Sequence, residues 1–334
     1  MTVPSLLRSE AVEAAAALLG PIASRDAPLG PLTTYRVGGP AALLARPRTL
    51  EELAAVGRAA AAVDLPLLVV GRGSNLLISD AGFPGIALTL AELATQIDVP
   101  VDGAHGELAA VAGGAVALPT LARRTAAAGL TGFEWAVGVP GSIGGAVRMN
   151  AGGHGSDMAS CLVDVDVVDL RSAEPEPARW SVERIGLRFR GSDVTATQVV
   201  VRARIALRPG DRSAAEAEIA EIVRWRREHQ PGGQNAGSVF INPVPGEVSA
   251  GLLIDELGLR GLRVGTAWVS EKHANFIQAA EGGRAEDVRA VMEVVRQRVA
   301  DERGIALRSE VRLIGFEGDD GSPDPRTDRE RKTA

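Results

Sequence analysis

The sequence is poor in the residues that build disulfides, metal sites and membrane spans. Cys161 is the only cysteine among 334 residues, so no internal disulfide can form and a site of several thiolates is excluded. The four histidines have no metal-ligand spacing, which argues against a histidine-rich metal site. No apolar run approaches the ~18 residues of a membrane span, and the chain does not open on a basic segment followed by an apolar core. We therefore expect a cytoplasmic protein with no metal, signal peptide or transmembrane segment.

An excess of positive charge is also missing. The net charge is −6, so nothing predicts a general attraction to nucleic acid or to an anionic membrane. Hydrophobic residues make up 46% and charged residues 23%, which is typical of a folded globular protein of two or three domains at this length. An anionic ligand would have to be bound by local N–H groups and individual arginines.

Glycine is concentrated in one segment, residues 138–155 (GVPGSIGGAVRMNAGGHG), which holds seven glycines. Such a main chain can take positive φ, approach a ligand closely and present N–H groups to a phosphate or pyrophosphate. A flexible surface loop is the alternative, but a linker carries serine and charge rather than interleaved Val139, Ile143, Val147 and Met149. The pattern favours a ligand-binding loop.

A second glycine-rich turn, residues 71–75 (GRGSN), follows an apolar segment. It lacks the Gly-Lys-Ser/Thr ending of a nucleoside triphosphatase and does not open a helix as GxGxxG. By itself it is more typical of a tight strand connection. Together with residues 138–155 it predicts that two loops hold the two ends of one long phosphorylated cofactor. Residues 35–40 (YRVGGP) are a third such element.

Periodicity predicts an α/β (α+β) protein with helix-opening capping boxes at Thr49/Glu52 and Ser213/Glu216. The break at residues 231–233 indicates a domain boundary, and the charged tail from residue 317 to 334 is expected to be disordered. The expected helices are 10–19, 49–63, 118–128, 213–230, 250–257 and 285–303. The expected strands are 41–47, 67–71, 85–90, 107–112, 162–170, 197–207, 266–269, 274–280 and 310–315.

Seven segments, in this order along the chain, resemble the UDP-N-acetylenolpyruvoylglucosamine reductase family. They cover nearly the whole chain before the tail, and seven in register are far more specific than one. The connection after Pro243 is short, so the chain resembles the branch without a long insertion there. The segments are 35–41 (YRVGGPA), 69–80 (VVGRGSNLLISD), 138–152 (GVPGSIGGAVRMNAG), 235–243 (NAGSVFINP), 251–261 (GLLIDELGLRG), 270–277 (SEKHANFI) and 309–315 (SEVRLIG).

The resemblance implies an FAD-binding unit of the PCMH/vanillyl-alcohol-oxidase type in two subdomains, residues 1–94 and 95–210, and an α+β substrate domain, residues 211–316. FAD would lie between the first two, and the third would close over the substrate. NADPH would reduce the flavin and leave, and UDP-N-acetylglucosamine-enolpyruvate would then be reduced to UDP-N-acetylmuramate. We expect a monomer that serves peptidoglycan synthesis, and through it cell-wall biogenesis, cell shape, division and the cell cycle.

The resemblance also implies the site residues. Arg190 matches the family's catalytic arginine, which would stabilise the enolate-like charge that hydride transfer creates. Glu310 matches the catalytic glutamate, either as a neutral acid that donates to the enolate or as a partner that orients the arginine. Ser238 matches the proton donor. By spacing alone, these three would be interpreted as an exposed strand arginine, an exposed strand carboxylate and a turn serine.

The implied cofactor-binding residues lie in the three glycine-rich elements. They are Tyr35, Gly38, Gly39, Gly71, Arg72, Gly73, Ser74, Asn75, Gly138, Pro140, Gly141, Ser142, Gly144, Gly145, Asn150 and Gly152. The implied substrate-binding residues are Asn242, His229 and Arg227, and Arg226 is a further source of positive charge.

The chain departs from the family pattern at four positions. Ile241 and His229 stand where lysines are common, and His154 and Phe189 stand where tyrosines are common. These departures keep open another FAD oxidoreductase of the same fold with a different alcohol or enol as substrate. A non-catalytic paralogue that binds flavin or a UDP-sugar is the other alternative. The presence of all three implied catalytic residues argues against it.

Overall fold

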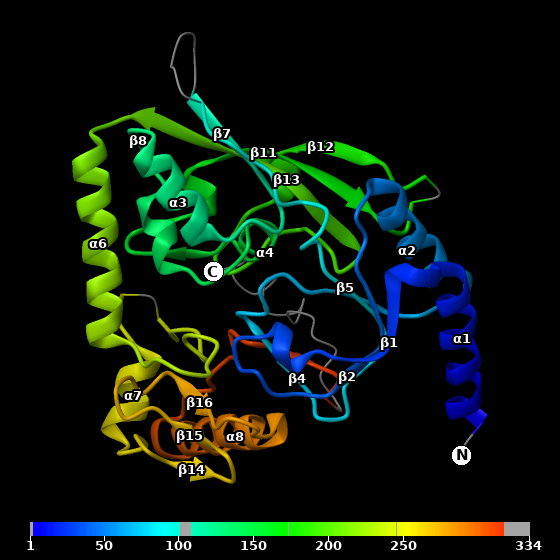
Figure 1. The fold of residues 1–334 in the computed structure, drawn as a ribbon. Coiled ribbons are helices and arrows are strands. Elements are labelled where there is room, and N and C mark those ends of the chain that lie inside the picture. The colour runs from blue at the N-terminus through cyan, green and yellow to red at the C-terminus, as the bar shows by residue number, and fades with distance from the viewer. Residues whose placement is uncertain (1–2, 101–107, 173, 245, 317–334) are drawn as a thin grey trace, which may run out of the picture. The chain divides into compact units, whose positions relative to one another are not determined.

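The computed structural model describes residues 3–100, 108–172, 174–244 and 246–316 (Figure 1). The chain divides into two compact units, each built from several chain segments. Counting only the described residues, unit 1 lies within residues 3–27, 41–74 and 84–232, and unit 2 within residues 28–40, 75–83 and 233–316. Because the segment 75–83 belongs to unit 2, that unit is not a simple C-terminal half.

Helices and runs of strands are interspersed along the chain. The helices are α1 (Val3–Leu19), α2 (Leu50–Ala62), α3 (Leu118–Ala127), α4 (Ile143–Met149), α5 (Val182–Ile185), α6 (Arg212–His229), α7 (Ala250–Glu256) and α8 (Ala285–Arg303). The strands are β1 (Ala23–Pro28), β2 (Pro40–Ala45), β3 (Leu67–Val69), β4 (Leu76–Ile78), β5 (Phe83–Leu88), β6 (Ile97–Asp98), β7 (Leu108–Gly113), β8 (Leu130–Thr131), β9 (Gly152–Gly153), β10 (Ser156–Asp157), β11 (Leu162–Asp169), β12 (Pro177–Ser181), β13 (Gln198–Pro209), β14 (Arg263–Val264), β15 (Ala267–Val269), β16 (Ile277–Ala279) and β17 (Arg312–Ile314).

The largest sheet lies in unit 1 and is antiparallel, in the order β12-β11-β13-β7-β6, with β8 paired to β13. Val165 pairs with Ala203, which in turn pairs with Ala112 on β7. These alternating apolar residues are buried, and α3, α4 and α6 complete the same core. The sheet therefore provides a rigid support for the glycine-rich loop, whose α4 contacts β7 and β13.

A second sheet, β1-β2-β5-β3, lies mostly in unit 1, and its β3 and β5 are parallel. Thr49 caps α2 by accepting a hydrogen bond from the Glu52 N–H, as the capping box predicts. The Glu52 carboxylate reaches back to the Arg48 N–H, one residue before the cap. Helices α1 and α2 contact each other and share a core with this sheet.

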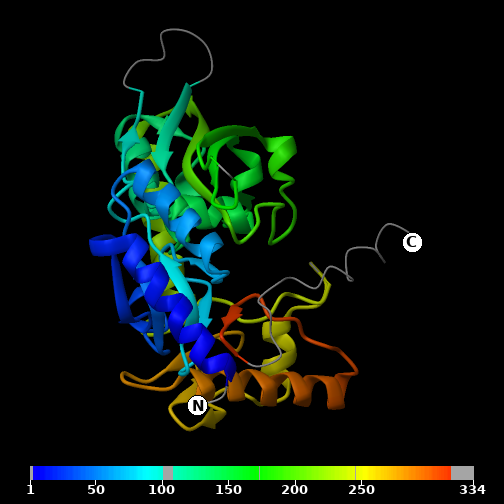
Figure 2. The same cartoon turned by 90° about the vertical axis from the view of Figure 1, so that its right-hand side faces the viewer.

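Unit 2 contains the three-stranded antiparallel sheet β14-β15-β16 and the parallel pair β4-β17. The long helix α8, drawn in orange, packs on that sheet through Val288, Val291 and Val295 (Figures 1 and 2). Tyr35, Leu77 and the buried α7 residues Ala250, Leu253 and Ile254 belong to the same core. Segments from three distant parts of the sequence are therefore packed around one core.

Most expected long elements are confirmed within a few residues, but α1 begins at Val3 rather than at residue 10. Two expectations of local structure are wrong. The helix expected to open at Ser213 is capped instead by Asp211, which accepts from the Ala214 N–H. Residues 138–155 are not only a loop, because they contain α4. Expected positions 107 and 317–334 lie outside the described residues, and the three domain boundaries stay a prediction.

Two negative observations concern the described ranges only. None of their helices is long and apolar enough to cross a membrane. The same ranges hold no group of three or more His, Cys, Asp or Glu side chains placed to bind a metal ion.

Candidate active site

The two glycine-rich loops of unit 1 touch each other. A Cβ atom added at Gly71 would collide with Ser142 Oγ, and one added at Gly141 would lie 3.7 Å from Ser74 Oγ. Ser142 is buried and caps α4, so its position is fixed. A side chain at position 71 would not fit this close approach, so residues 71–74 pack directly against residues 138–145.

The main-chain amides of the two loops differ. Among the described residues, no protein acceptor takes the N–H groups of Gly71, Arg72, Gly73 or Ser74. This arrangement fits an anion.

At the start of α4 the amides are already used. The Ile143 N–H donates to Val116 O at 2.9 Å, and the Gly144 N–H donates to Gly114 O at 2.9 Å. The Gly145 N–H donates to the cap Ser142. The expectation that both loops present bare amides is therefore wrong for the first amides of α4, which donate to the turn after β7 and to the cap Ser142 instead.

Left-handed backbone conformations cluster at the expected site residues. Six described residues other than glycine have positive φ, and four of them lie in the expected motifs or are implied site residues. They are Arg36 (φ 54°), Asn150 (φ 41°), His154 (φ 52°) and Arg190 (φ 58°). Such strain costs about 1–3 kcal/mol per residue and concentrates at functional sites.

Arg190 occupies the tip of a tight turn in unit 1. Arg188 and Gly191 exchange two main-chain hydrogen bonds of 3.0 Å, which leaves Phe189 and Arg190 as the central residues. The second central position of this turn favours glycine, since its φ is positive. The guanidinium of Arg190 is near the exposed ring of Phe189, 5.5 Å from its centroid.

Two of the residues that depart from the family pattern, His154 and His229, are joined by a tryptophan. Trp225 stacks on His229 at 4.6 Å between ring centroids and meets His154 edge-on at 5.3 Å. A Cβ added at Gly138 would lie 2.7 Å from the ring of His154. Trp225 was not identified from the sequence, because an exposed helical tryptophan has no motif.

The electrostatics of this cluster are set mainly by burial. Burial and the charge of Arg226 hold the pKa of His154 below its usual value. Burial also lowers the pKa of Arg226 itself, whereas the neighbouring Arg227 is exposed. His229 Nδ1 lies 2.8 Å from the Trp225 carbonyl, which fixes the imidazole against α6.

Ser238 and Glu310 lie on neighbouring segments of unit 2. The Glu310 N–H donates to the carbonyl of Val239, the residue after Ser238, at 2.7 Å. Phe240 and Ser309 form an antiparallel bridge beside it. Two of the three implied catalytic residues are therefore brought together by main-chain pairing, while Arg190 belongs to unit 1.

Asn275 supports the segment that carries Ser238. Its buried amide accepts from the Phe240 N–H at 2.9 Å and donates to the Phe240 carbonyl at 2.8 Å. Its own carbonyl accepts from the Val239 N–H at 2.9 Å. The motif of residues 270–277 therefore holds the main chain next to Ser238, the candidate proton donor. The sequence of the motif does not reveal this role.

Other implied residues of unit 2 are part of its structure. The ring of Tyr35 is fully buried, so a cofactor contact would have to come from its main chain. Gly38 and Gly39 lie against the backbone of Ile78 and Asp80. The side-chain oxygen of Asn242 accepts from the Ala250 N–H at 3.1 Å, at the start of α7.

Three further implied cofactor residues lie in unit 1. Arg72 and Pro140 are exposed, and Gly152 pairs with Asp157 in the β9–β10 hairpin. The adjacent Asn150 is buried, and its amide bridges to the Asp157 carboxylate and to the Ala159 N–H.

Comparison with known proteins decides the family. Residues 41–173 match the model of an FAD binding domain, and residues 229–314 match that of the UDP-N-acetylenolpyruvoylglucosamine reductase C-terminal domain. A UDP-N-acetylenolpyruvoylglucosamine reductase from Synechococcus sp. (strain WH7803) is 41% identical over 90% of this chain and 95% of its own length. The chain belongs to the UDP-N-acetylenolpyruvoylglucosamine reductase family.

Two further relatives agree. The reductase from Heliobacterium modesticaldum is 43% identical over 87% of this chain and 90% of its own length. The crystal structure of the reductase from Thermus caldophilus covers 87% of this chain and 98% of its own, with 35% identity and a TM-score of 0.72. The expected family, the α/β fold with an FAD-binding unit and the assignment as a flavin-dependent oxidoreductase are confirmed.

Proposed function

We propose that this chain reduces UDP-N-acetylglucosamine-enolpyruvate to UDP-N-acetylmuramate, with NADPH as the hydride source and FAD as the cofactor. It would act in the cytoplasm as a monomer, without nucleic acid. Its product would enter peptidoglycan synthesis and so support cell shape, division and the cell cycle. The observation that carries the proposal is the 2.7 Å hydrogen bond from the Glu310 amide to Val239, which holds Glu310 beside Ser238.

The flavin supplies the hydride chemistry when bound. The residues of this chain manage the charge and the proton. Arg190 stabilises the negative charge that develops on the carboxylate side of the enolpyruvyl group, and Glu310 either donates a hydrogen bond to that charge as a neutral acid or orients Arg190. Ser238 donates a proton to the carbanion that hydride transfer leaves in the enolpyruvyl group. Because this carbanion is a strong base, a hydroxyl can act as the proton donor.

Main-chain amides and individual side chains provide the binding groups. The N–H groups of residues 71–74 take the phosphates of the cofactor, and the packing of Gly71 on Ser142 sets their position. Arg227, His229 and Asn242 bind the substrate, with Arg226 as a further cation. His154 and His229, which contact Trp225, depart from the family pattern. They support a second candidate function, that of a reductase of the same fold that acts on another enol.

Stopped-flow spectroscopy of the flavin separates these functions. The wild-type enzyme, reduced anaerobically, should be reoxidised rapidly by the enolpyruvyl sugar nucleotide. Glu310→Gln should lower that rate by about 10²- to 10⁴-fold, the range that general acid–base groups contribute. Ser238→Ala should slow product formation and leave flavin reduction by NADPH nearly normal, because only proton transfer is affected.

A matched control is Glu302→Gln, an exposed carboxylate on α8 that pairs with Arg298. It should react like the wild-type enzyme. Bound flavin that is inert to this substrate would favour the second candidate, and a well-folded protein that takes up no flavin would contradict the proposal altogether.

A further inference from the structure

Asn75 joins the end of a glycine-rich loop to Glu310 within unit 2. Its side-chain amide donates to the Glu310 carbonyl at 3.0 Å, across 235 residues of sequence. Its own carbonyl accepts from the Arg312 N–H at 3.0 Å. Strands β4 and β17 then continue this contact as a parallel pair, Leu76 beside Arg312 and Ile78 beside Ile314. Glu310 is thus attached to the segment 75–80.

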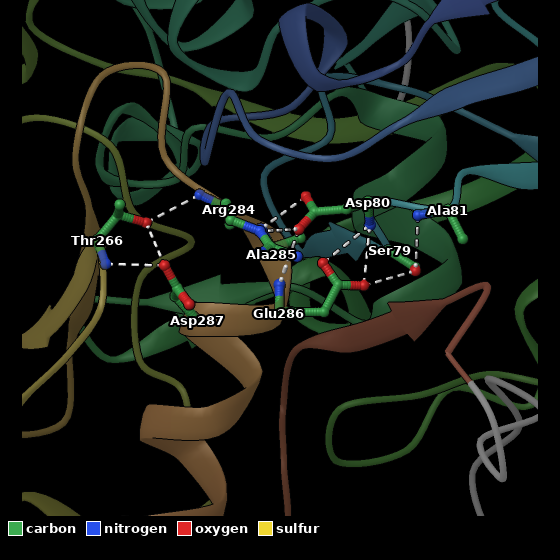
Figure 3. A network of polar contacts seen from close by, with 8 residues as sticks. All are labelled: Ser79, Asp80, Ala81, Thr266, Arg284, Ala285, Glu286 and Asp287. Carbon is green, nitrogen blue, oxygen red and sulfur yellow. Dashed lines mark hydrogen bonds and ion pairs between the residues drawn. The ribbon is translucent and has the colours of Figure 1, made fainter.

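The other end of that segment is attached to α8 (Figure 3). Asp80 accepts from the Ala285 N–H at 2.9 Å and from Arg284 Nε at 3.2 Å. In return, Glu286 accepts from Ser79 Oγ at 2.9 Å and from the Asp80 N–H at 3.1 Å. The two carboxylates therefore bind each other's chain segments, 206 residues apart.

This arrangement does the work of a capping box with its two halves on different segments. The N-cap residue of α8, Arg284, makes no side-chain cap hydrogen bond, so Asp80 supplies the cap from outside. Burial tends to raise the pKa of Asp80, but its hydrogen bonds to Glu286, Ala285 and Arg284 outweigh burial and lower it. A carboxylate at a helix N-terminus also gains from the helix dipole.

Helix α8 offers a fixed attachment point. Asp287 accepts from the Thr266 N–H at 2.8 Å and from its hydroxyl at 2.7 Å, which ties the first turn to the loop before β15 (Figure 3). Val288, Val291 and Val295 are fully buried in the core of unit 2. Movement of the segment 75–80 is therefore limited by a well-packed helix.

We propose that Asp80 and Glu286 are positioning residues for Glu310. They fix one end of the segment 75–80 on α8, and Asn75 at its other end holds the Glu310 carbonyl. The strand that follows Glu310, β17, is only three residues long, so it has few hydrogen bonds of its own to set the backbone. The inference rests on the catalytic role proposed for Glu310.

The test is Glu286→Ala, which removes the acceptor for Ser79 Oγ and the Asp80 N–H. With FAD saturating, reoxidation of the reduced flavin by the enolpyruvyl substrate should slow roughly 10-fold, less than the ~10²-fold that a 1 Å misplacement can cost. Flavin reduction by NADPH, which does not need Glu310, should change by less than about 2-fold. Glu293→Ala, which removes an exposed ion pair with Arg296 on the same helix, is the control and should match the wild type.

A double-mutant cycle with Asn75→Ala separates positioning from general support. If Glu286 acts through the segment, the double variant should be no slower in reoxidation than the slower single variant. Fully multiplicative effects, or equal losses in both half-reactions, would overturn the inference. Asp80→Glu, which keeps the carboxylate, should regain part of the rate lost in Asp80→Ala. A wild-type enzyme that does not reduce the substrate would instead contradict the proposed function.

Discussion

Units 1 and 2 hold their candidate site residues by different means. In unit 1 the two loops are placed by close packing, with Gly71 against the Ser142 side chain and the first α4 amides on the turn after β7. In unit 2 the placement depends on side-chain amides and carboxylates, mainly Asn75, Asn275 and Asp80. Substitutions that add volume should therefore disturb the loops of unit 1, and substitutions that remove hydrogen bonds should disturb the site residues of unit 2.

The largest expected effect concerns Arg190. Its charge favours the reaction, whereas its positive φ lowers the stability of the fold. Arg190→Gly should raise the free energy of unfolding by ~1 kcal/mol, because glycine adopts φ 58° without strain. The same change should lower the rate of reoxidation by the substrate about 10²- to 10³-fold, through loss of the cation. Chemical denaturation and stopped-flow measurements on one preparation test both signs. A variant that loses stability would show that the turn does not store strain.

The second prediction tests the polar support in unit 2. Asn275→Ala leaves the N–H and carbonyl of buried Phe240 without their side-chain partner. Each such group costs about 1–3 kcal/mol, so the free energy of unfolding should fall by ~2–6 kcal/mol. Urea denaturation measures it. A loss of less than ~0.5 kcal/mol in the free energy of unfolding would contradict the view that side-chain hydrogen bonds hold the site residues of unit 2.

The third prediction tests steric placement in unit 1. Gly71→Ala should weaken FAD binding about 10- to 100-fold, since overpacking costs ~1–3 kcal/mol. In a Ser142→Ala background the new Cβ would lie 3.5 Å from that of residue 142, an ordinary contact, so much of the affinity should return. Flavin titration by fluorescence measures both. If Gly71→Ala weakened FAD binding equally in both backgrounds, steric contact with Ser142 would not be the cause.

The smallest effect is expected at Cys161, a thiol in the core of unit 1. Burial raises its pKa to about 12 from an ordinary 9.0. The raised pKa favours the neutral thiol in the folded state, so its contribution to stability is complete below pH 9 and is lost as the pH rises through about 12. Ellman's reagent at pH 8 should label it only after unfolding. Rapid labelling of the native protein would contradict this burial.

The sequence predicted some parts of the site well and others poorly. The Thr49 cap and the strands β11 and β13 depend on residues close together in sequence, and both are confirmed. The cap at Asp211 was misassigned because Ser213 offers an equally good local pattern two residues later. The short helix α4 was missed because its glycines lower helix propensity, and tertiary contacts with β13 outweigh that cost.

The sequence by itself determined the family, the glycine-rich loops and the long amphipathic elements, because each is written in neighbouring residues. Only the tertiary structure decided that residues 75–83 pack with residues 233–316, that Asp80 caps α8, and that the turn after β7 accepts from the first amides of α4. These contacts join segments distant in sequence, and such pairing leaves no periodicity or spacing in the chain to predict it.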